Sequence, residues 1–307
     1  MAAWPSLRRD CWLIPAGSSC TLFLQPKHLN AEGGFIMGLD TRWVRYGADD
    51  RYMGYLAVQD HAQTPLPAVV VLQEVWGVDQ HIEDVTERFA KAGYVAFAPD
   101  LYAVGGKRPE ALHRDRVEAV KAFMEKLPPT AWGNPAERDA ELAKLPGDEP
   151  QRVRETMTAL FSGLDVDNYT DQLRATADFL RNQCQLSKGQ SVVAVGYCLG
   201  GALAAHLASH DPELKGAVMY YGRSPKDERI AAIQCPVRAF YGELDAQLTA
   251  TAPALAEAMS KAGKDFEYKV YPGAHHAFFN DTRRSYNVAA SRDAFTRTLA
   301  YFNEWVG

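Results

Sequence analysis

The chain has 307 residues, a length that suits one large α/β domain or two average domains. Lys and Arg total 33 and Asp and Glu total 38, so the net charge is −5, and this mildly acidic balance argues against nucleic-acid binding. With 47% hydrophobic and 23% charged residues, the composition excludes wholesale disorder and supplies ample apolar material for a core.

Residues 1–36 show neither helix nor strand periodicity. Two arginines precede an uncharged run, as in an export signal, but a proline and a glycine interrupt that run. The periodic sequence begins shortly after Met37. We therefore expect residues 1–36 to form a loose N-terminal extension and residues 37–307 to form one domain.

From about residue 52 onward, short apolar runs alternate with longer amphipathic stretches. The run at 68–72 is continuous and β-branched, which is typical of a strand covered on both faces. Strands are predicted at residues 52–58, 68–72, 94–98, 192–195, 217–220, 237–241 and 266–270. Helices are predicted at residues 78–92, 108–127, about 136–145, 152–161, 169–183, 200–210, 253–262 and 286–305. This alternation predicts a mostly parallel sheet with helices on both faces.

The region at about residues 103–165 is helical and lacks a strand pattern. We expect it to be a helical insertion near the carboxyl ends of the strands, where parallel sheets bind ligands. A second unusual stretch, residues 189–210, has no charged residue and is long enough to span a bilayer. Its glycines and serines, and its change from β-branched to alanine-rich sequence, indicate a strand, a turn and a buried helix instead. No membrane partner is therefore expected.

The cysteines are odd in number and share no repeated spacing, which argues against a disulfide framework and a zinc site. They are Cys11, Cys20, Cys184, Cys198 and Cys235. A reducing compartment, the cytoplasm, is therefore expected. His206 and His210 have a spacing that could bind a metal on a helix, but no Glu follows His206, so we predict no metal site.

The most specific motif is the string GYCLGG at residues 196–201, between a predicted strand and a predicted helix. It matches the G-x-nucleophile-x-G elbow of α/β hydrolases, with Cys198 in place of the usual serine. Glycines are needed there because strand and helix converge at a sharp turn, and the helix N-terminus favours a thiolate. A buried cysteine beside a pair of helix-packing glycines is the simpler interpretation. The strand–turn–helix context favours the elbow and predicts an α/β-hydrolase fold.

A thiol nucleophile needs a base and a group that orients the base. In this fold class the chain order is nucleophile, acid, histidine. Asp245 follows a predicted strand, and His276 lies in a glycine-rich loop after the last strand, so both fit this order. Glu243 remains an alternative acid and His275 an alternative base.

Five sequence blocks, in order, resemble the dienelactone hydrolase family. They are QEVWG at 73–77, PDLYA at 99–103, GYCLGG at 196–201, YYG at 220–222 and YPGAHHAF at 271–278. The resemblance covers roughly residues 50–305. It implies that Cys198 is the nucleophile, Asp245 the acid and His276 the base, because His276 stands two residues before Phe278.

The resemblance implies further roles. The backbone amides of Leu199 and Val75 form the oxyanion hole, which in this fold includes a donor from that loop. Glu74 interacts with the resting thiol until substrate displaces it, although a carboxylate at a strand end could also simply cap a loop. We expect residues within or next to these motifs to contact the substrate, namely Trp76, Tyr102, Tyr197, Arg223, Phe278 and Asn280.

Two positions depart from the family. The arginines that hold the substrate carboxylate in this family correspond here to Val104 and Asn280. The sequence therefore predicts neutral or differently anchored substrates. Arg223 is the first candidate for a replacement cation. Other basic residues nearby in sequence are Lys107, Arg108, Arg283 and Arg284.

The expected function is hydrolysis of a small-molecule ester or lactone through an acyl-thiol intermediate, without a cofactor. The alternative is a thiol-based sensor or ligand-binding protein that keeps the fold without turnover. The complete set of Cys198, His276 and Asp245 favours the enzyme, because a sensor needs no aligned base and acid. The sequence does not indicate an oligomeric state.

Overall fold

The computed structural model describes residues 38–62, 65–128, 131, 134–162 and 164–307. The expected N-terminal extension, residues 1–36, lies outside the described residues.

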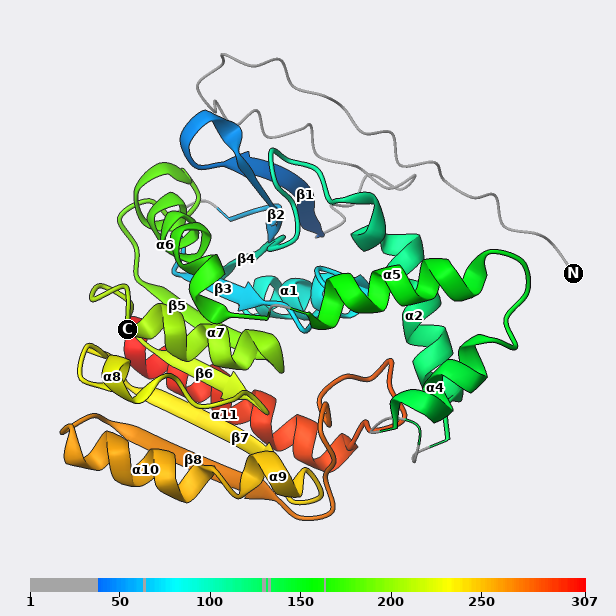
Figure 1. The fold of residues 1–307 in the computed structure, drawn as a ribbon. Coiled ribbons are helices and arrows are strands. Elements are labelled where there is room, and N and C mark those ends of the chain that lie inside the picture. The colour runs from blue at the N-terminus through cyan, green and yellow to red at the C-terminus, as the bar shows by residue number, and fades with distance from the viewer. Residues whose placement is uncertain (1–37, 63–64, 129–130, 132–133, 163) are drawn as a thin grey trace, which may run out of the picture. The chain divides into compact units, whose positions relative to one another are not determined.

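The described chain forms a single eight-stranded sheet in the order β1-β2-β4-β3-β5-β6-β7-β8 (Figure 1). Strands β3 to β8 are parallel, whereas β2 is antiparallel to both of its neighbours. The strands are β1 Leu39–Tyr46, β2 Tyr52–Gln59, β3 Ala68–Leu72, β4 Val95–Pro99, β5 Val192–Tyr197, β6 Ala217–Tyr220, β7 Val237–Gly242 and β8 Phe266–Tyr271. The predicted mostly parallel α/β sheet is confirmed.

The helices follow the predicted ranges closely, except for the four-residue helices α8 and α9, which were not predicted. They are α1 Gln80–Lys91, α2 Arg114–Lys126, α4 Pro135–Leu142, α5 Glu149–Phe161, α6 Thr170–Asp178, α7 Leu199–Ala208, α8 Asp227–Ile230, α9 Ala246–Thr249, α10 Ala252–Lys261 and α11 Val288–Val306. The helix predicted at 169–183 continues beyond α6 as a π-helical turn, Phe179–Gln183. No helix in the described part of the chain is long and apolar enough to cross a membrane.

Apolar side chains pack on both faces of the sheet. In β3, Val69 and Val71 point to the face that α1 and α11 cover. Val70 and Leu72 point to the opposite face, against α6, α7 and α10. Successive strand residues alternate between faces, so a strand buried on both sides must be apolar throughout. This explains the uninterrupted run that marked β3 in the sequence.

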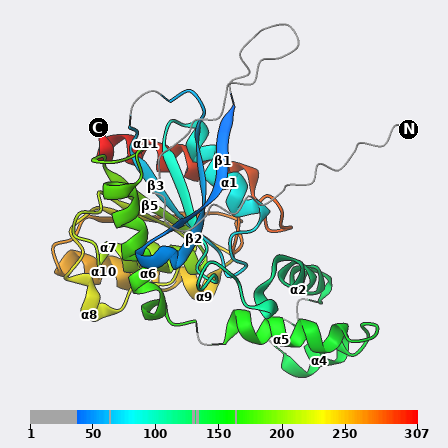
Figure 2. The same cartoon turned by 90° about the horizontal axis from the view of Figure 1, so that it is seen from above.

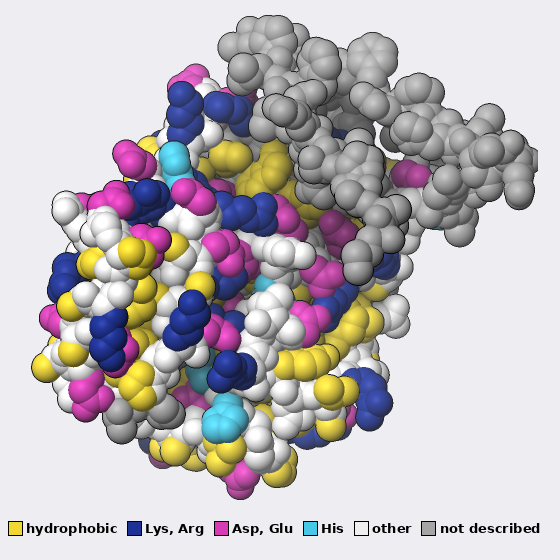
Figure 3. All heavy atoms as spheres, turned by 90° about the vertical axis from the view of Figure 1, so that its right-hand side faces the viewer, with side chains coloured by type: hydrophobic (Ala, Val, Ile, Leu, Met, Phe, Trp, Pro, Cys, Tyr) yellow, Lys and Arg dark blue, Asp and Glu magenta, His cyan; other side chains and the backbone are white. Residues whose placement is uncertain are grey.

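Helices α2, α4 and α5 form a separate group beside the layered core (Figure 2). Their apolar residues make a third cluster, which also takes in Val75, Trp76 and Tyr102 from loops at the ends of β3 and β4. The helical region therefore packs directly on the loop that follows β3. Acidic and basic side chains are interspersed over the described part of the face in Figure 3.

Candidate active site

Cys198 occupies the turn between β5, which ends at Tyr197, and α7, which begins at Leu199. Its backbone φ is 55° and ψ is −111°. Residues with a side chain rarely adopt positive φ, and such strain costs about 1–3 kcal/mol. The turn therefore holds Cys198 in a strained conformation at the N-terminus of α7, where unpaired amides and the helix dipole favour a thiolate.

The glycines around Cys198 are required by close contacts between backbones. A Cβ atom on Gly196 would lie 1.8 Å from the carbonyl oxygen of Gly200, and one on Gly200 would lie 2.1 Å from that of Leu72. Neither distance is possible without moving the backbone. The GYCLGG string is thus explained by the approach of β5, α7 and the end of β3.

Cys198 is also the most accessible of the described cysteines. It is partly exposed, whereas Cys184 and Cys235 are buried, and all three are free thiols. Burial raises the pKa of the Cys235 thiol to about 12. Of the described thiols, Cys198 is therefore the one that a substrate can reach.

His276 and Asp245 lie in the loops that follow β8 and β7. The Nδ1 atom of His276 is 2.6 Å from Oδ2 of Asp245. Burial lowers the pKa of His276, but hydrogen bonding to Asp245 and Cys198, and the charges of both groups, outweigh burial and raise it to about 10. The side chain remains 43% exposed, so solvent screening moderates this shift. The structure thus brings Cys198, His276 and Asp245 together.

The two alternatives left by the sequence are placed elsewhere. Glu243 accepts a hydrogen bond from the backbone N–H of Gly273 at 2.8 Å, so its carboxylate supports the histidine loop. His275 is exposed and makes no hydrogen bond within the described residues. The geometry therefore pairs Asp245 with His276.

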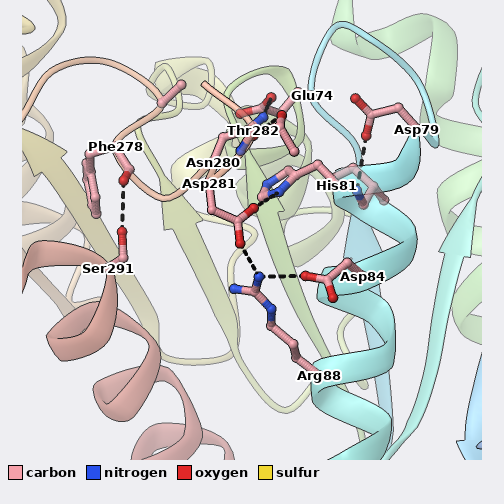
Figure 4. Close-up of polar contacts among 12 residues, drawn as sticks. Glu74, Asp79, His81, Asp84, Arg88, Phe278, Asn280, Asp281, Thr282 and Ser291 are labelled. Atoms are coloured by element: carbon pink, nitrogen blue, oxygen red, sulfur yellow. Dashed lines mark hydrogen bonds and ion pairs between the residues drawn. The ribbon is translucent and has the colours of Figure 1, made fainter. Parts of the chain in front are cut away.

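Glu74 is buried at the end of β3, with only 2% of its surface exposed. One carboxylate oxygen accepts a hydrogen bond from the Tyr221 hydroxyl at 3.2 Å. The other accepts a hydrogen bond from Nδ2 of Asn280 at 2.8 Å (Figure 4). No described cation pairs with it. Asn280 is fully buried, and its Oδ1 accepts hydrogen bonds from the backbone N–H and the hydroxyl of Thr282. These bonds fix the Asn280 amide, which in turn positions Glu74.

No role for Tyr221 was predicted from the sequence. This residue has a φ of 39°, an outlier for a bulky side chain. Its ring lies 5.1 Å from that of His276, and its hydroxyl donates to Glu74. Burial, followed by the charge of Glu74, raises its pKa well above the ordinary value, so the hydroxyl stays protonated. The only signal in the sequence was its place in the YYG block.

Next along the loop, Asp281 ties the histidine loop to α1. Its carboxylate is 2.5 Å from Arg88 Nη2 and 3.5 Å from Nδ1 of the buried His81, and Arg88 also contacts Asp84 (Figure 4). The close approach of His81, together with the hydrogen bond and charge of Arg88, lowers the pKa of Asp281. The loop that carries His276 is therefore anchored to the sheet and to α1.

The amides expected to form the oxyanion hole are available. Leu199 is the first residue of α7, where helical N–H groups lack an acceptor within the helix. Within the described residues, the Val75 amide makes no backbone hydrogen bond. The Val75 carbonyl accepts a hydrogen bond from the Tyr102 hydroxyl at 2.7 Å, which fixes the orientation of this peptide.

The aromatic residues expected to contact substrate fall into two groups. Trp76 and Tyr102 lie at the junction with the helical region, where Trp76 packs edge-on against Phe161 of α5. Tyr197 and Phe278 are fully buried in the core beneath the elbow. A substrate would reach these two side chains only after a rearrangement, so their direct contact with it stays a prediction.

The candidate cations also differ in their surroundings. Arg223 is exposed just beyond β6 and makes no ion pair within the described residues. Arg108 is engaged, with Nε 2.6 Å from Asp100 and Nη2 3.1 Å from the carbonyl oxygen of Val78. Val104 is 78% exposed and offers only an apolar side chain.

No cluster of three metal-ligating side chains occurs among the described residues. The rings of His206 and His210 are 4.1 Å apart, but Nε2 of His206 is hydrogen bonded to Thr170. Burial lowers the pKa of His206 to about 4. The hydrogen bond between His206 and Thr170 links α7 to α6.

The sheet order and the strained turn between β5 and α7 are those of an α/β hydrolase. The sequence profile of the dienelactone hydrolase family matches residues 53–306. The chain belongs to this family and is a hydrolase.

Relatives agree with this assignment. The "Putative carboxymethylenebutenolidase" of Saccharolobus solfataricus is 32% identical over 240 residues, covering 78% of this chain and 90% of the relative. The protein of the same name from Escherichia coli O157:H7 is 29% identical, with 84% of each chain covered. The crystal structure titled "Putative Dienelactone Hydrolase" from Klebsiella pneumoniae has a TM-score of 0.64 and 27% identity, covering 87% of this chain and 100% of that one.

Proposed function

We propose that this hydrolase cleaves a carboxylic ester or lactone through an acyl-thiol intermediate on Cys198. His276 acts as the general base and acid, and Asp245 orients its imidazole. The observation that carries the proposal is the 2.6 Å contact between His276 and Asp245, together with a partly exposed cysteine held in a strained turn at the N-terminus of α7. An orienting carboxylate, a base and an accessible nucleophile are the parts of a catalytic triad.

The reaction proceeds in two balanced halves. The Cys198 thiol gives its proton to His276, and Sγ attacks the carbonyl carbon, whose π electron pair moves to oxygen. When this pair returns, the carbon–oxygen bond to the leaving group breaks and His276 protonates the departing alcohol. In the second half, water gives a proton to His276 and attacks the thioester, and Cys198 leaves with that proton to restore the thiol.

The amides of Leu199 and Val75 stabilise the negative oxygen formed in each half. Glu74 modulates the thiol from its buried position at the end of β3. The proposed substrate is a neutral or differently anchored ester rather than the carboxylate typical of the family, because Val104 and Asn280 supply no cation. Arg223 is the exposed candidate for an alternative anchor. The free thiols of the described cysteines support a reducing compartment, the cytoplasm.

The acyl-thiol intermediate can be tested directly. Rapid mixing with a chromogenic short-chain aryl ester should release a burst of about one phenol molecule per enzyme molecule. Mass spectrometry should find the acyl group on the peptide that contains Cys198. Cys235→Ser is the matched control, because its thiol is buried and should not affect the burst. A folded protein that binds such esters without burst or turnover would favour the thiol-based sensor instead.

A further inference from the structure

Strand β8 forms one edge of the described sheet and pairs with β7 alone (Figure 1). Val237 of β7 lies opposite Phe266, and its backbone N–H donates to the carbonyl oxygen of Asp265 at 2.9 Å. Because backbone groups alternate in direction along a strand, every second residue from Asp265 onward faces β7. The backbone N–H and C=O groups of Phe266, Tyr268 and Val270 therefore face outward. Within the described residues these groups make no hydrogen bond to another segment.

This edge lacks the features that usually prevent another strand from pairing. A row of unpaired backbone groups is a template for a further strand, and proteins commonly block it with a proline, a bulge or a single kind of charge. Strand β8 reads FEYKVY, without a proline, and its register with β7 is unbroken. Its two charges have opposite signs and stand on either side of Tyr268. The edge is therefore open and carries a charge pattern of its own.

That charge pattern is complementary to a second copy of the same strand. When two β8 strands pair antiparallel about Tyr268, Glu267 of each chain lies opposite the partner's Lys269. These are non-hydrogen-bonded pairs, in which the facing side chains are closest. A shift by two residues, the smallest that keeps the outward groups paired, places Glu267 opposite the partner's Glu267 or Lys269 opposite the partner's Lys269. Charge thus selects one register, and the strand that fits it is β8 itself.

Both charged side chains are accessible at the edge. Glu267 is 67% exposed and lies 3.7 Å from Arg238, whereas Lys269 is 39% exposed and contacts Asp293 at 2.8 Å. A carboxylate accepts several hydrogen bonds and an ammonium group donates three, so both groups can also contact a partner chain. A hollow of about 240 Å³, lined by residues of β7, β8 and α11, adjoins them. Helix α11 therefore leaves this side of β8 open.

The opposite face of β8 supplies an apolar contact in the same register. Tyr268 is 38% exposed, and its ring stacks on that of Phe266 with the ring centres 6.2 Å apart. Phe266 and Val270 pack on the core but are only partly buried. Pairing about Tyr268 places its ring beside the partner's Tyr268, and Phe266 beside the partner's Val270. Such aromatic and aliphatic pairs stabilise neighbouring strands.

We propose that β8 is a homodimer interface, in which the β8 strands of two copies pair antiparallel about Tyr268 and join the two sheets into one. A single strand pair buries little area, and interfaces below about 1,200 Å² belong to weak, reversible complexes. The carboxyl ends of antiparallel strands point in opposite directions, so the two candidate active sites remain apart. Dimerisation is therefore independent of the proposed hydrolysis.

Analytical ultracentrifugation of the full chain over a concentration series should show a reversible monomer–dimer equilibrium. Glu267→Lys and Lys269→Glu each turn two opposite-charge pairs into two like-charge pairs, so the dimer Kd should rise by about tenfold or more. Combining both changes in one chain should restore the parental Kd. Mixing the two single variants should produce a heterodimer, because each chain then supplies one sign of charge. Lys144→Glu is the matched control: this residue is 67% exposed on α4, and its change should leave Kd unaltered.

A second pair of variants tests the backbone contact. Tyr268→Pro removes an N–H group that faces the partner and leaves the hydrogen bonds to β7 intact, so it should abolish the dimer. Tyr268→Ala removes the ring but keeps this N–H group, so it should still dimerise, with a higher Kd than the parent. Thermal unfolding shows whether each variant is folded. The charge variants decide the matter if Tyr268→Pro does not fold.

A full chain that stays monomeric across the series would overturn the proposal. A dimer with the parental Kd in both single charge variants would also overturn it, because its interface would lie elsewhere. Equal loss of the dimer in Tyr268→Pro and Tyr268→Ala would show a contact through the ring rather than strand pairing, with the same consequence. A monomeric full chain beside a charge-dependent dimer of the chain that begins at Met37 would assign the edge to residues 1–36 instead of a second copy.

Discussion

At the scale of single residues, three of the five described non-glycine residues with positive φ lie around the candidate site. They are Cys198, Tyr221 and Ala277, and they come from three different loops at the carboxyl ends of the strands. Strain of this kind persists only where the surrounding packing enforces it. The strained conformations of these three residues lower the stability of the fold, and they position the thiol, the Tyr221 ring beside His276 and the residue that follows His276.

The strain at Cys198 can be separated from its chemistry. Cys198→Ala and Cys198→Gly should both abolish turnover, because each removes the proposed nucleophile. Cys198→Gly should be more stable than Cys198→Ala by about 1 kcal/mol, because glycine adopts positive φ without a steric penalty. Turnover follows from a chromogenic ester assay and stability from urea unfolding. Substantial esterase activity in either folded variant would rule out Cys198 as the nucleophile.

Tyr221 should matter through its hydroxyl. Tyr221→Phe keeps the ring against His276 but leaves Oε1 of the buried Glu74 without its donor, so stability should fall by about 1–3 kcal/mol. We also expect lower kcat, because Glu74 is no longer fixed. Tyr241→Phe is the matched control: its hydroxyl is buried without a partner, so its loss should not destabilise. Equal unfolding free energies and equal kcat for the two variants would contradict a positioning role for Tyr221.

The pKa of His276 predicts how stability depends on pH. The folded state raises this pKa from 6.5 to about 10, so the folded protein binds the proton more tightly than the unfolded chain. The resulting stabilisation is complete below about pH 6.5 and is lost as pH rises towards 10. Urea unfolding between pH 6 and 10 should show this loss in the parent and a smaller one in His276→Gln. Identical pH profiles for the two proteins would contradict the raised pKa.

At the scale of elements, the sequence predicts what is continuous along the chain. Strands β3 and β5, buried on both faces, stand out as uninterrupted apolar runs, and the elbow between β5 and α7 is marked by its glycines. Strand β1 was missed because it lies at the sheet edge, where Arg42 and Arg45 flank the adjacent pair Trp43 and Val44, so the sequence shows neither strict alternation nor a continuous apolar run. The four-residue helices α8 and α9 are too short to show a period.

Contacts between loops that are distant in the sequence cannot be predicted from such continuous patterns. The hydrogen bond from Asn280 to Glu74 joins residues 206 positions apart, and the contact of Arg283 with Trp76 depends on where α2 packs. From the sequence, Asn280 stood out only as a departure from a family pattern. In the structure its side chain donates a hydrogen bond to Glu74. That contact could not be predicted without knowing how the loops after β3 and β8 meet.

At the scale of the whole molecule, the described residues contain an eight-stranded sheet and the candidate site. The first described strand begins at Leu39, and the proposed catalytic residues and their partners lie between Glu74 and Asn280. Among the described residues, all three apolar clusters are assembled from residues that follow Gly38. Folding and chemistry should therefore not require residues 1–36.

Removing those residues tests this directly. A chain that begins at Met37 should keep the kcat/KM and the Tm of the full chain, because termini contribute little unless they pack on the domain. Leu22, Phe23 and Leu24 are the residues most able to do so, because three consecutive apolar side chains can cover an exposed surface. Thermal unfolding of the full chain, the truncated chain and a full chain with these three changed to Ser separates the possibilities. A Tm lower by more than about 4 °C in both altered chains, equivalent to more than 1 kcal/mol, would show that the segment is part of the folded unit.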